Sequence, residues 1–139
     1  MTNEELMRLA VQARENAYAP YSKFCVGAAL LCADGSVVSG CNVESAAYSP
    51  TCCAERTALV KAISEGKRDF LAIAIVGGRK GAVQSDCTPC GVCRQMLYEL
   101  GGKDLLVITA GSDGEPICRT MSELLPKGFD LKECEEMPC

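Results

Sequence analysis

The chain contains no histidine among its 139 residues. Without an imidazole, no Ser-His or Cys-His nucleophile can be built, and a metal ion can be held only by thiolates and carboxylates. Long apolar runs are also absent, since no run approaches the roughly 18 residues that a transmembrane helix needs. The first residues, "MTNEELMRLAVQARENAY", lack the basic and apolar regions of a signal peptide. We therefore expect a cytoplasmic protein with no membrane partner.

Positive charge is in deficit as well. The net charge is −4 and the isoelectric point is near 4.9. Binding to nucleic acid needs clustered Lys and Arg to neutralise phosphates, so this composition argues against a nucleic-acid partner.

Cysteine, in contrast, is abundant. The chain has 11 cysteines, an odd number, without a secretion signal. A reducing cytosol is therefore favoured over a disulfide scaffold. Some of these cysteines are expected to be small buried hydrophobic residues, and Cys25, Cys32, Cys41 and Cys118 lie in predicted strands.

The length and the hydrophobic fraction of 48% suit one domain, which we assign to residues 1–139. The apolar periodicity and turn signals predict helices at 3–16, 53–65 and 91–102, strands at 24–32, 36–42, 70–78 and 104–110, and a last strand and short helix within 116–125. The alternation predicts a three-layer α/β/α sandwich with a mixed, mostly parallel five-stranded sheet, after an antiparallel first pair.

The stretch "CTPCGVCRQ" spaces three cysteines evenly, at Cys87, Cys90 and Cys93. The Cys90/Cys93 pair alone is a weak signal, because redox dithiols and buried thiols share this spacing. A bacterial iron–sulfur motif would need a fourth cysteine where Leu97 stands. A thioredoxin-like pair would follow the first strand, and this pair comes after the third.

The earlier stretch "TCCAERTAL" favours a metal site. It puts Cys53 and Glu55 in the first turn of a predicted helix, as Cys90 and Cys93 open another. Unpaired N–H groups and the helix dipole favour thiolates there. Three sulfur ligands beside a carboxylate suit catalytic zinc, whose fourth position is left to water. By proximity alone, Cys52 and Cys87 are rival ligands.

Four segments carry a resemblance to a known family: "YAPYSKFCVGAALL", "CNVESAAYSPTCCAERTAL", "TPCGVCRQ" and "LLPKGF". Over nearly its whole length the chain resembles the small cytidine deaminases of the homotetrameric type. In these segments Ser45 replaces the family's usual Asn, and Thr88 its usual Ser. The motif selects Cys53, Cys90 and Cys93 as zinc ligands, which leaves Cys52 and Cys87 as bystanders.

The resemblance implies a cytidine deaminase-like fold and zinc-dependent deamination of free cytidine and deoxycytidine to uridine and deoxyuridine. Water activated by one Zn²⁺ per subunit attacks C4, with Glu55 as the proton shuttle. The resemblance also implies a homotetramer with shared active sites. The residues that match the family's nucleoside site are Phe24 (pyrimidine), Asn42 and Glu44 (ribose), Ala46 and Tyr48 (substrate and subunit-contact loop), Ala54, and Phe129 (a neighbour's pocket).

Simpler structural roles remain open for several of these residues. Phe24 beside Val26 is also a typical core pattern, Asn42 and Glu44 can end a strand, and Tyr48 can be a surface residue. A related deaminase of the blasticidin S type and a non-enzymatic zinc module are alternative functions. A polynucleotide-editing role is a third, and the acidic balance and short loops argue against it.

Arg56 is expected to offset negative charge. Zinc with three thiolates carries a formal charge of −1, which makes a poor Lewis acid. Arg56 follows Cys53 by three residues, a spacing that brings side chains together on a helix.

Overall fold

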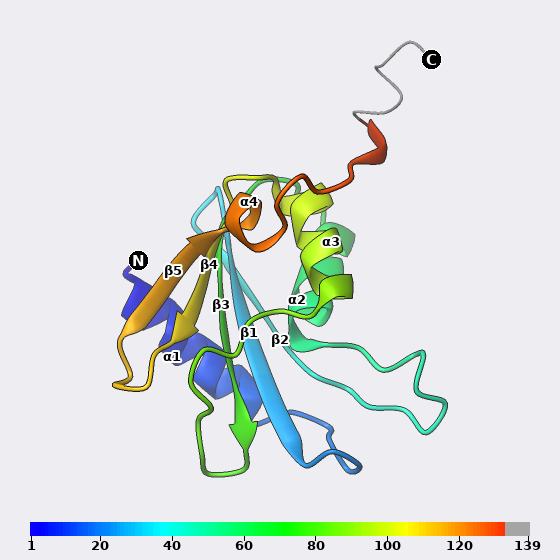
Figure 1. Ribbon diagram of the computed structural model, residues 1–139, viewed down its shortest axis with the longest axis vertical. Coiled ribbons are helices and arrows are strands. Elements are labelled where there is room, and N and C mark those ends of the chain that lie inside the picture. The colour runs from blue at the N-terminus through cyan, green and yellow to red at the C-terminus, as the bar shows by residue number, and fades with distance from the viewer. Residues whose placement is uncertain (133–139) are drawn as a thin grey trace.

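The computed structural model describes residues 1–132, and the cysteines of the tail, Cys134 and Cys139, lie outside them. The elements in chain order are α1 (Asn3–Arg14), β1 (Phe24–Cys32), β2 (Val37–Cys41), α2 (Ala54–Ser64), β3 (Phe70–Arg79), α3 (Gly91–Gly101), β4 (Leu106–Ala110), β5 (Pro116–Thr120) and α4 (Met121–Leu124) (Figure 1). Each predicted helix and strand is present, with ends that differ by a few residues.

The five strands form one mixed sheet in the order β2-β1-β3-β4-β5. Among the strand pairings of the described residues, β3–β4 alone is parallel, whereas β1–β2, β1–β3 and β4–β5 are antiparallel. The prediction of a mostly parallel sheet is therefore wrong. The helical connections do join strands of equal direction, but β1 lies between β2 and β3 and runs against both.

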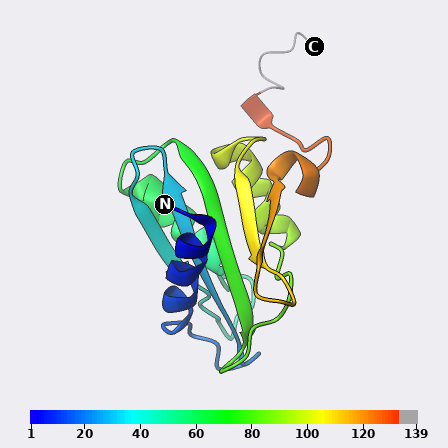
Figure 2. The same cartoon turned by 90° about the vertical axis from the view of Figure 1, so that its left-hand side faces the viewer.

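Helices cover both faces of the sheet, as the predicted three-layer sandwich requires. In Figures 1 and 2, α1 lies on one face, and α2 and α3 lie on the other. Alternating residues of β1 supply both cores, because Ala28 and Leu30 belong to the cluster under α2 and α3 and Ala29 to the cluster under α1. The apolar runs of β1 and β3 arise because both strands are buried on both faces.

Two glycines set the distance between the sheet and its helices. A Cβ on Gly27 of β1 would lie 2.0 Å from the carbonyl oxygen of Ala10 in α1. A Cβ on Gly40 of β2 would lie 2.5 Å from the backbone nitrogen of Ala58 in α2. Because both obstacles are backbone atoms, only glycine lets these helices pack so closely. The second contact fixes α2, which begins beside Cys53.

The cysteines among residues 1–132 are all free thiols. Cys32 is buried and Cys25 and Cys41 are half-buried, but Cys118 is exposed. Its assignment to the core is therefore wrong, because β5 is an edge strand with no fully buried residue. Within the same described range, none of the helices has the length and apolar character needed to cross a bilayer.

Candidate active site

Two helix N-termini carry the cysteines of the predicted metal site. Cys53 is the N-cap of α2 (φ −71°, ψ 155°), and Cys90 is the N-cap of α3 (φ −67°, ψ 169°). Neither side chain makes a capping hydrogen bond. Their sulfurs are therefore free to face one another across the gap between the helices, next to the unpaired N–H groups of both first turns.

The sulfurs of Cys53, Cys90 and Cys93 gather in one cluster, all within 4.8 Å of one another. The Cys53 and Cys90 sulfurs are 3.9 Å apart. Tetrahedral zinc with bonds of about 2.3 Å would place its sulfurs roughly 3.8 Å apart. The observed spacing fits that geometry with little adjustment, and Cys93 is fully buried on the inner side of the cluster.

The thiols of this cluster shift one another's pKa values. A hydrogen bond from Cys93 lowers the pKa of Cys53 to about 5, and the positive charge of Arg56 acts in the same direction. The same hydrogen bond raises the pKa of Cys93. Burial raises the pKa of the neighbouring Cys87 thiol to about 11, so that side chain stays protonated. This favours Cys53 over Cys87 as an anionic metal ligand.

Glu55 is the second residue of α2 and is 4% exposed. No cation forms a salt bridge with its carboxyl group among the described residues. Burial raises the pKa of this carboxyl group, and the charge of Cys53 adds to the effect. A buried carboxyl group beside three sulfurs has the properties expected of an acid–base group.

Arg56 points its guanidinium group back toward the start of its helix. Its Nη2 donates to the carbonyl oxygen of Thr51 at 2.8 Å. Its Nε is buried and has no hydrogen-bond partner in the described part of the chain. An unpaired buried N–H beside a thiol cluster would gain an acceptor if the thiols became metal-bound thiolates.

A cavity of about 340 Å³ opens beside the cluster. Its wall is formed by Ser22, Phe24, Val26, Asn42, Glu44, Thr51, Cys52, Cys53, Ala54, Glu55, Ile75, Cys87, Thr88 and Cys90. The cavity thus joins an apolar side, the polar side chains of Asn42, Glu44 and Thr51 from the β2–α2 connection, the buried carboxyl group, and the sulfurs of Cys53 and Cys90. Its volume suits a small molecule.

A family model described as "Cytidine and deoxycytidylate deaminase zinc-binding region" matches residues 1–109. The chain belongs to the cytidine and deoxycytidylate deaminase family. It is 49% identical to a cytidine deaminase of Halalkalibacterium halodurans over 136 residues, which cover 98% of this chain and all of that protein. The crystal structure of cytidine deaminase from Burkholderia pseudomallei matches with a TM-score of 0.85 at 46% identity, over 93% of this chain and all of that one.

A second solved cytidine deaminase is similar to this chain as well. Cytidine deaminase from Mycobacterium tuberculosis matches with a TM-score of 0.78 at 43% identity, over 93% of this chain and 98% of that one. The family's metal is zinc, and the matched region contains the sulfur cluster. The three thiols, their spacing and the unpaired Nε of Arg56 all fit that ion.

The predicted nucleoside residues of this deaminase fall into two groups. Phe24, Asn42, Glu44 and Ala54 line the cavity. Ala46 is exposed, and Tyr48 is 81% exposed and lines an adjoining hollow with Glu44. Phe129 is 56% exposed, outside the cavity wall.

Further cavity residues were not singled out from the sequence, namely Ser22, Val26, Thr51 and Ile75. Val26 could have been found, because it follows Phe24 by two positions on a strand and so shares its face. Cys52 and Cys87 line the cavity too, outside the cluster of three sulfurs.

Proposed function

We propose that this protein catalyses the zinc-dependent hydrolytic deamination of free cytidine and deoxycytidine to uridine and deoxyuridine. The observation that carries the proposal is the buried carboxyl group of Glu55 in the wall of a cavity that reaches Cys53 and Cys90, two members of the sulfur cluster. The relatives named cytidine deaminase support the same assignment. In this proposal the 139 residues form a single catalytic domain with one Zn²⁺.

Asn42 and Glu44 are proposed to hold the ribose hydroxyls. The Asn42 side chain accepts from the N–H of Val26 at 2.9 Å and donates to the carbonyl of Phe24 at 2.8 Å. These bonds fix the amide but leave one N–H and one lone pair for a ligand. Glu44 accepts from Tyr21 and Ser22. A carboxylate has about four acceptor sites, so a hydroxyl can still bind.

Phe24 and Ala54 are proposed to hold the pyrimidine. Phe24 presents its ring in the cavity wall, and a flat base can pack on it. Ala54 is fully buried between Cys53 and Glu55. Its small side chain leaves room for the exocyclic amino group to approach the sulfur cluster.

Glu55 is proposed to carry the proton through the reaction. Zinc, when bound by the three sulfurs, supplies a Lewis acid that lowers the pKa of a water molecule. Glu55 would take one proton from the water that attacks C4 and deliver it to N3. It would then take the remaining proton from the new C4 hydroxyl and pass it to the departing amine. The carbon–oxygen bond forms, the carbon–nitrogen bond breaks, and ammonia leaves. Arg56 would donate to the sulfurs and offset their negative charge.

We also propose a homotetramer in which subunits share their active sites. Tyr48 and Phe129 are large, exposed aromatic residues, and Ala46 lies in the same exposed loop as Tyr48. Aromatic residues are enriched at protein–protein interfaces. A fully active monomer in light scattering at the assay concentration would contradict this part of the proposal.

The deciding experiment is an ammonia-release assay with cytidine, deoxycytidine, blasticidin S and adenosine. We expect turnover of the first two, its loss after treatment with a chelator, and its recovery with zinc. Turnover of blasticidin S alone would instead support the related deaminase. Stoichiometric zinc without any ammonia release would point to a structural zinc module.

A further inference from the structure

The segment between β3 and α3 has no helix or strand from residue 80 to residue 90. It nevertheless ends at Cys90, and it also supplies Cys87 and Thr88 to the cavity wall. A loop of this length loses much conformational entropy when it is fixed in one conformation. Something must hold it if Cys90 is to lie near Cys53 before any ligand arrives.

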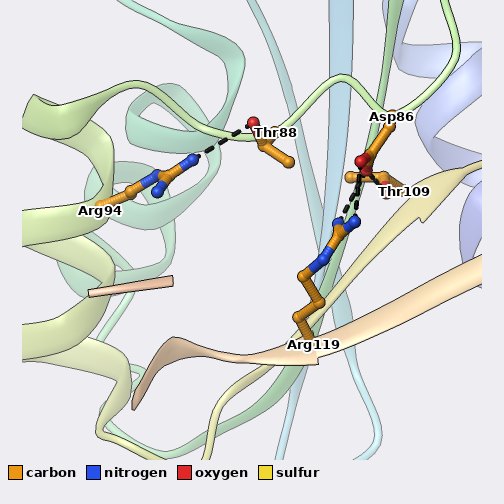
Figure 3. A network of polar contacts seen from close by, with 5 residues as sticks. All are labelled: Asp86, Thr88, Arg94, Thr109 and Arg119. Carbon is orange, nitrogen blue, oxygen red and sulfur yellow. Dashed lines mark hydrogen bonds and ion pairs between the residues drawn. The ribbon is translucent and has the colours of Figure 1, made fainter. Parts of the chain in front are cut away.

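Asp86 makes the strongest set of contacts in this loop. Its two carboxylate oxygens accept from the two terminal nitrogens of Arg119, each at 2.7 Å. The hydroxyl of Thr109 donates to one of the same oxygens at 2.7 Å. The Asp86 N–H donates to the carbonyl of Ala110 at 2.7 Å. Figure 3 shows the forked pair of Asp86 and Arg119, with Thr109 beside it.

These contacts tie the loop to two strands of the sheet. Thr109 and Ala110 end β4, and Arg119 belongs to the edge strand β5. Two parallel hydrogen bonds between a guanidinium and a carboxylate fix orientation as well as distance. Asp86 also has a φ of 53°, a left-handed conformation that aspartate and asparagine tolerate better than most residues.

A short, stiff connection leads from Asp86 to the metal ligand. The N–H of Thr88 donates to the carbonyl of Asp86 at 2.9 Å, and Pro89 then precedes Cys90. On the other side of the loop, Arg94 donates to the Thr88 hydroxyl at 3.2 Å (Figure 3). It also donates to the Pro89 carbonyl at 2.7 Å. A shift of Asp86 would therefore be passed on to Cys90.

We propose that the Asp86–Arg119 ion pair is a positioning device for the metal site, which holds Cys90 and the Cys87–Thr88 wall in place. The inference rests on the proposed function, since it assumes that Cys90 binds zinc. Neither Asp86 nor Arg119 lines the cavity, so the pair acts on the chemistry only through the loop.

The test compares Asp86→Asn with the wild-type holoenzyme. Asparagine keeps the size and the left-handed backbone, but its amide would turn a donor toward Arg119. Arg119→Lys is the second variant, because it keeps the charge and loses the fork. Asp34→Asn is the matched control, because Asp34 forms an ion pair with Lys67 elsewhere in the described residues, and neither lines the cavity.

The main readout is the rate of zinc transfer to a coloured chelator. Changing groups that orient metal ligands typically weakens metal binding about 10- to 100-fold. Because Asp86 acts through the backbone, we expect the low end, about tenfold faster release in Asp86→Asn, and about threefold in Arg119→Lys. The cobalt-loaded Asp86→Asn protein should also show a shifted visible absorption band. Asp34→Asn should match the wild type in both measurements.

The proposal would be overturned if both variants, Asp86→Asn and Arg119→Lys, released zinc within twofold of the wild-type rate. The cobalt absorption band would then also be unshifted. Equal acceleration in Asp34→Asn would overturn it too, because the effect would then reflect general loss of stability. If the wild-type protein binds zinc and deaminates cytidine, and the variants release zinc at the wild-type rate, only the ion-pair proposal is refuted. A wild-type protein that takes up no zinc refutes the proposed function itself.

Discussion

Replacing Arg56 with glutamine tests how the charge of three thiolates is balanced. In the zinc-free protein, the Nε of Arg56 is buried and has no partner, but its Nη2 donates to the carbonyl of Thr51 at 2.8 Å, so the substitution should cost about 0.5–1.5 kcal/mol of stability even without zinc. In the zinc-bound protein, the same group would donate to thiolate sulfur. Hydrogen bonds to charged groups contribute about 1.5–3 kcal/mol. The substitution should therefore weaken zinc binding about 10- to 150-fold.

The assay is the rise in melting temperature that zinc produces, with and without the substitution. For a chain of this size, one kcal/mol corresponds to roughly 4 °C. We therefore expect the zinc-dependent rise to shrink by about 6–12 °C in Arg56→Gln, in addition to a fall of about 2–6 °C in the zinc-free melting temperature from the lost bond to Thr51. The kcat for cytidine should fall as well, and a further Cys53→His substitution should restore part of it, because a neutral ligand removes one negative charge.

Arg68→Gln is the matched control, because Arg68 follows the opposite end of α2 and donates to the carbonyls of Ile63 and Lys67. It should leave the zinc-dependent rise unchanged. An Arg56→Gln protein with the wild-type rise and the wild-type kcat would refute the reasoning, and the charge would then be offset by the helix N-termini alone.

Three further predictions concern the same site and its supports. Glu55→Ala should keep stoichiometric zinc yet lose cytidine turnover by at least about 100-fold, since general acid–base catalysis contributes 10²–10⁴-fold; near wild-type turnover would exclude the proton-shuttle role. Gly40→Ala should lower the unfolding free energy by about 1–3 kcal/mol through overpacking against α2, whereas Gly91→Ala, with open space around its Cβ, should not. Arg119 lowers the pKa of Asp86 to about 2, so the extra stability of the zinc-free wild type over Asp86→Asn should be full above pH 4 and vanish toward pH 2 in urea titrations; a difference independent of pH would contradict this.

Local patterns were enough to predict the elements and to put cysteines at two helix starts, whereas the choice of Cys53, Cys90 and Cys93 over Cys52 and Cys87 rested on the family resemblance. The run from Phe24 to Cys32 has the bounds of β1 as predicted, because residues buried on both faces leave an unbroken apolar stretch. Cys53 and Cys90 could be assigned to helix starts because the apolar periodicity begins directly after each of them. The three sulfurs then meet because both helices start at the same end of the sheet.

Pairings between distant segments could not be predicted in this way. The position of β1 between β2 and β3 depends on how the strands add to the sheet, and alternating helices and strands are compatible with either order. The Asp86–Arg119 pair joins residues 33 positions apart, and neither residue type nor spacing marks it in the sequence. Such contacts depend on strand register, which becomes visible only once the sheet is assembled.

The capping of α1 to α4, the helices of the described residues, separates the site from the rest of the fold. The helices that begin away from the sulfur cluster have threonine caps, with a capping box at Thr2 for α1 and a side-chain bond from Thr120 for α4. The helices that begin at the cluster have Cys53 and Cys90 instead, and forgo that bond. Losing a good cap costs about 1 kcal/mol for each helix. Structural zinc contributes an apparent free energy of about 10–16 kcal/mol when it binds small domains. The loss at two helix starts would therefore be small beside such a gain, and a chain without histidine would hold the metal with two helix-capping cysteines and with Cys93 in the first turn of α3.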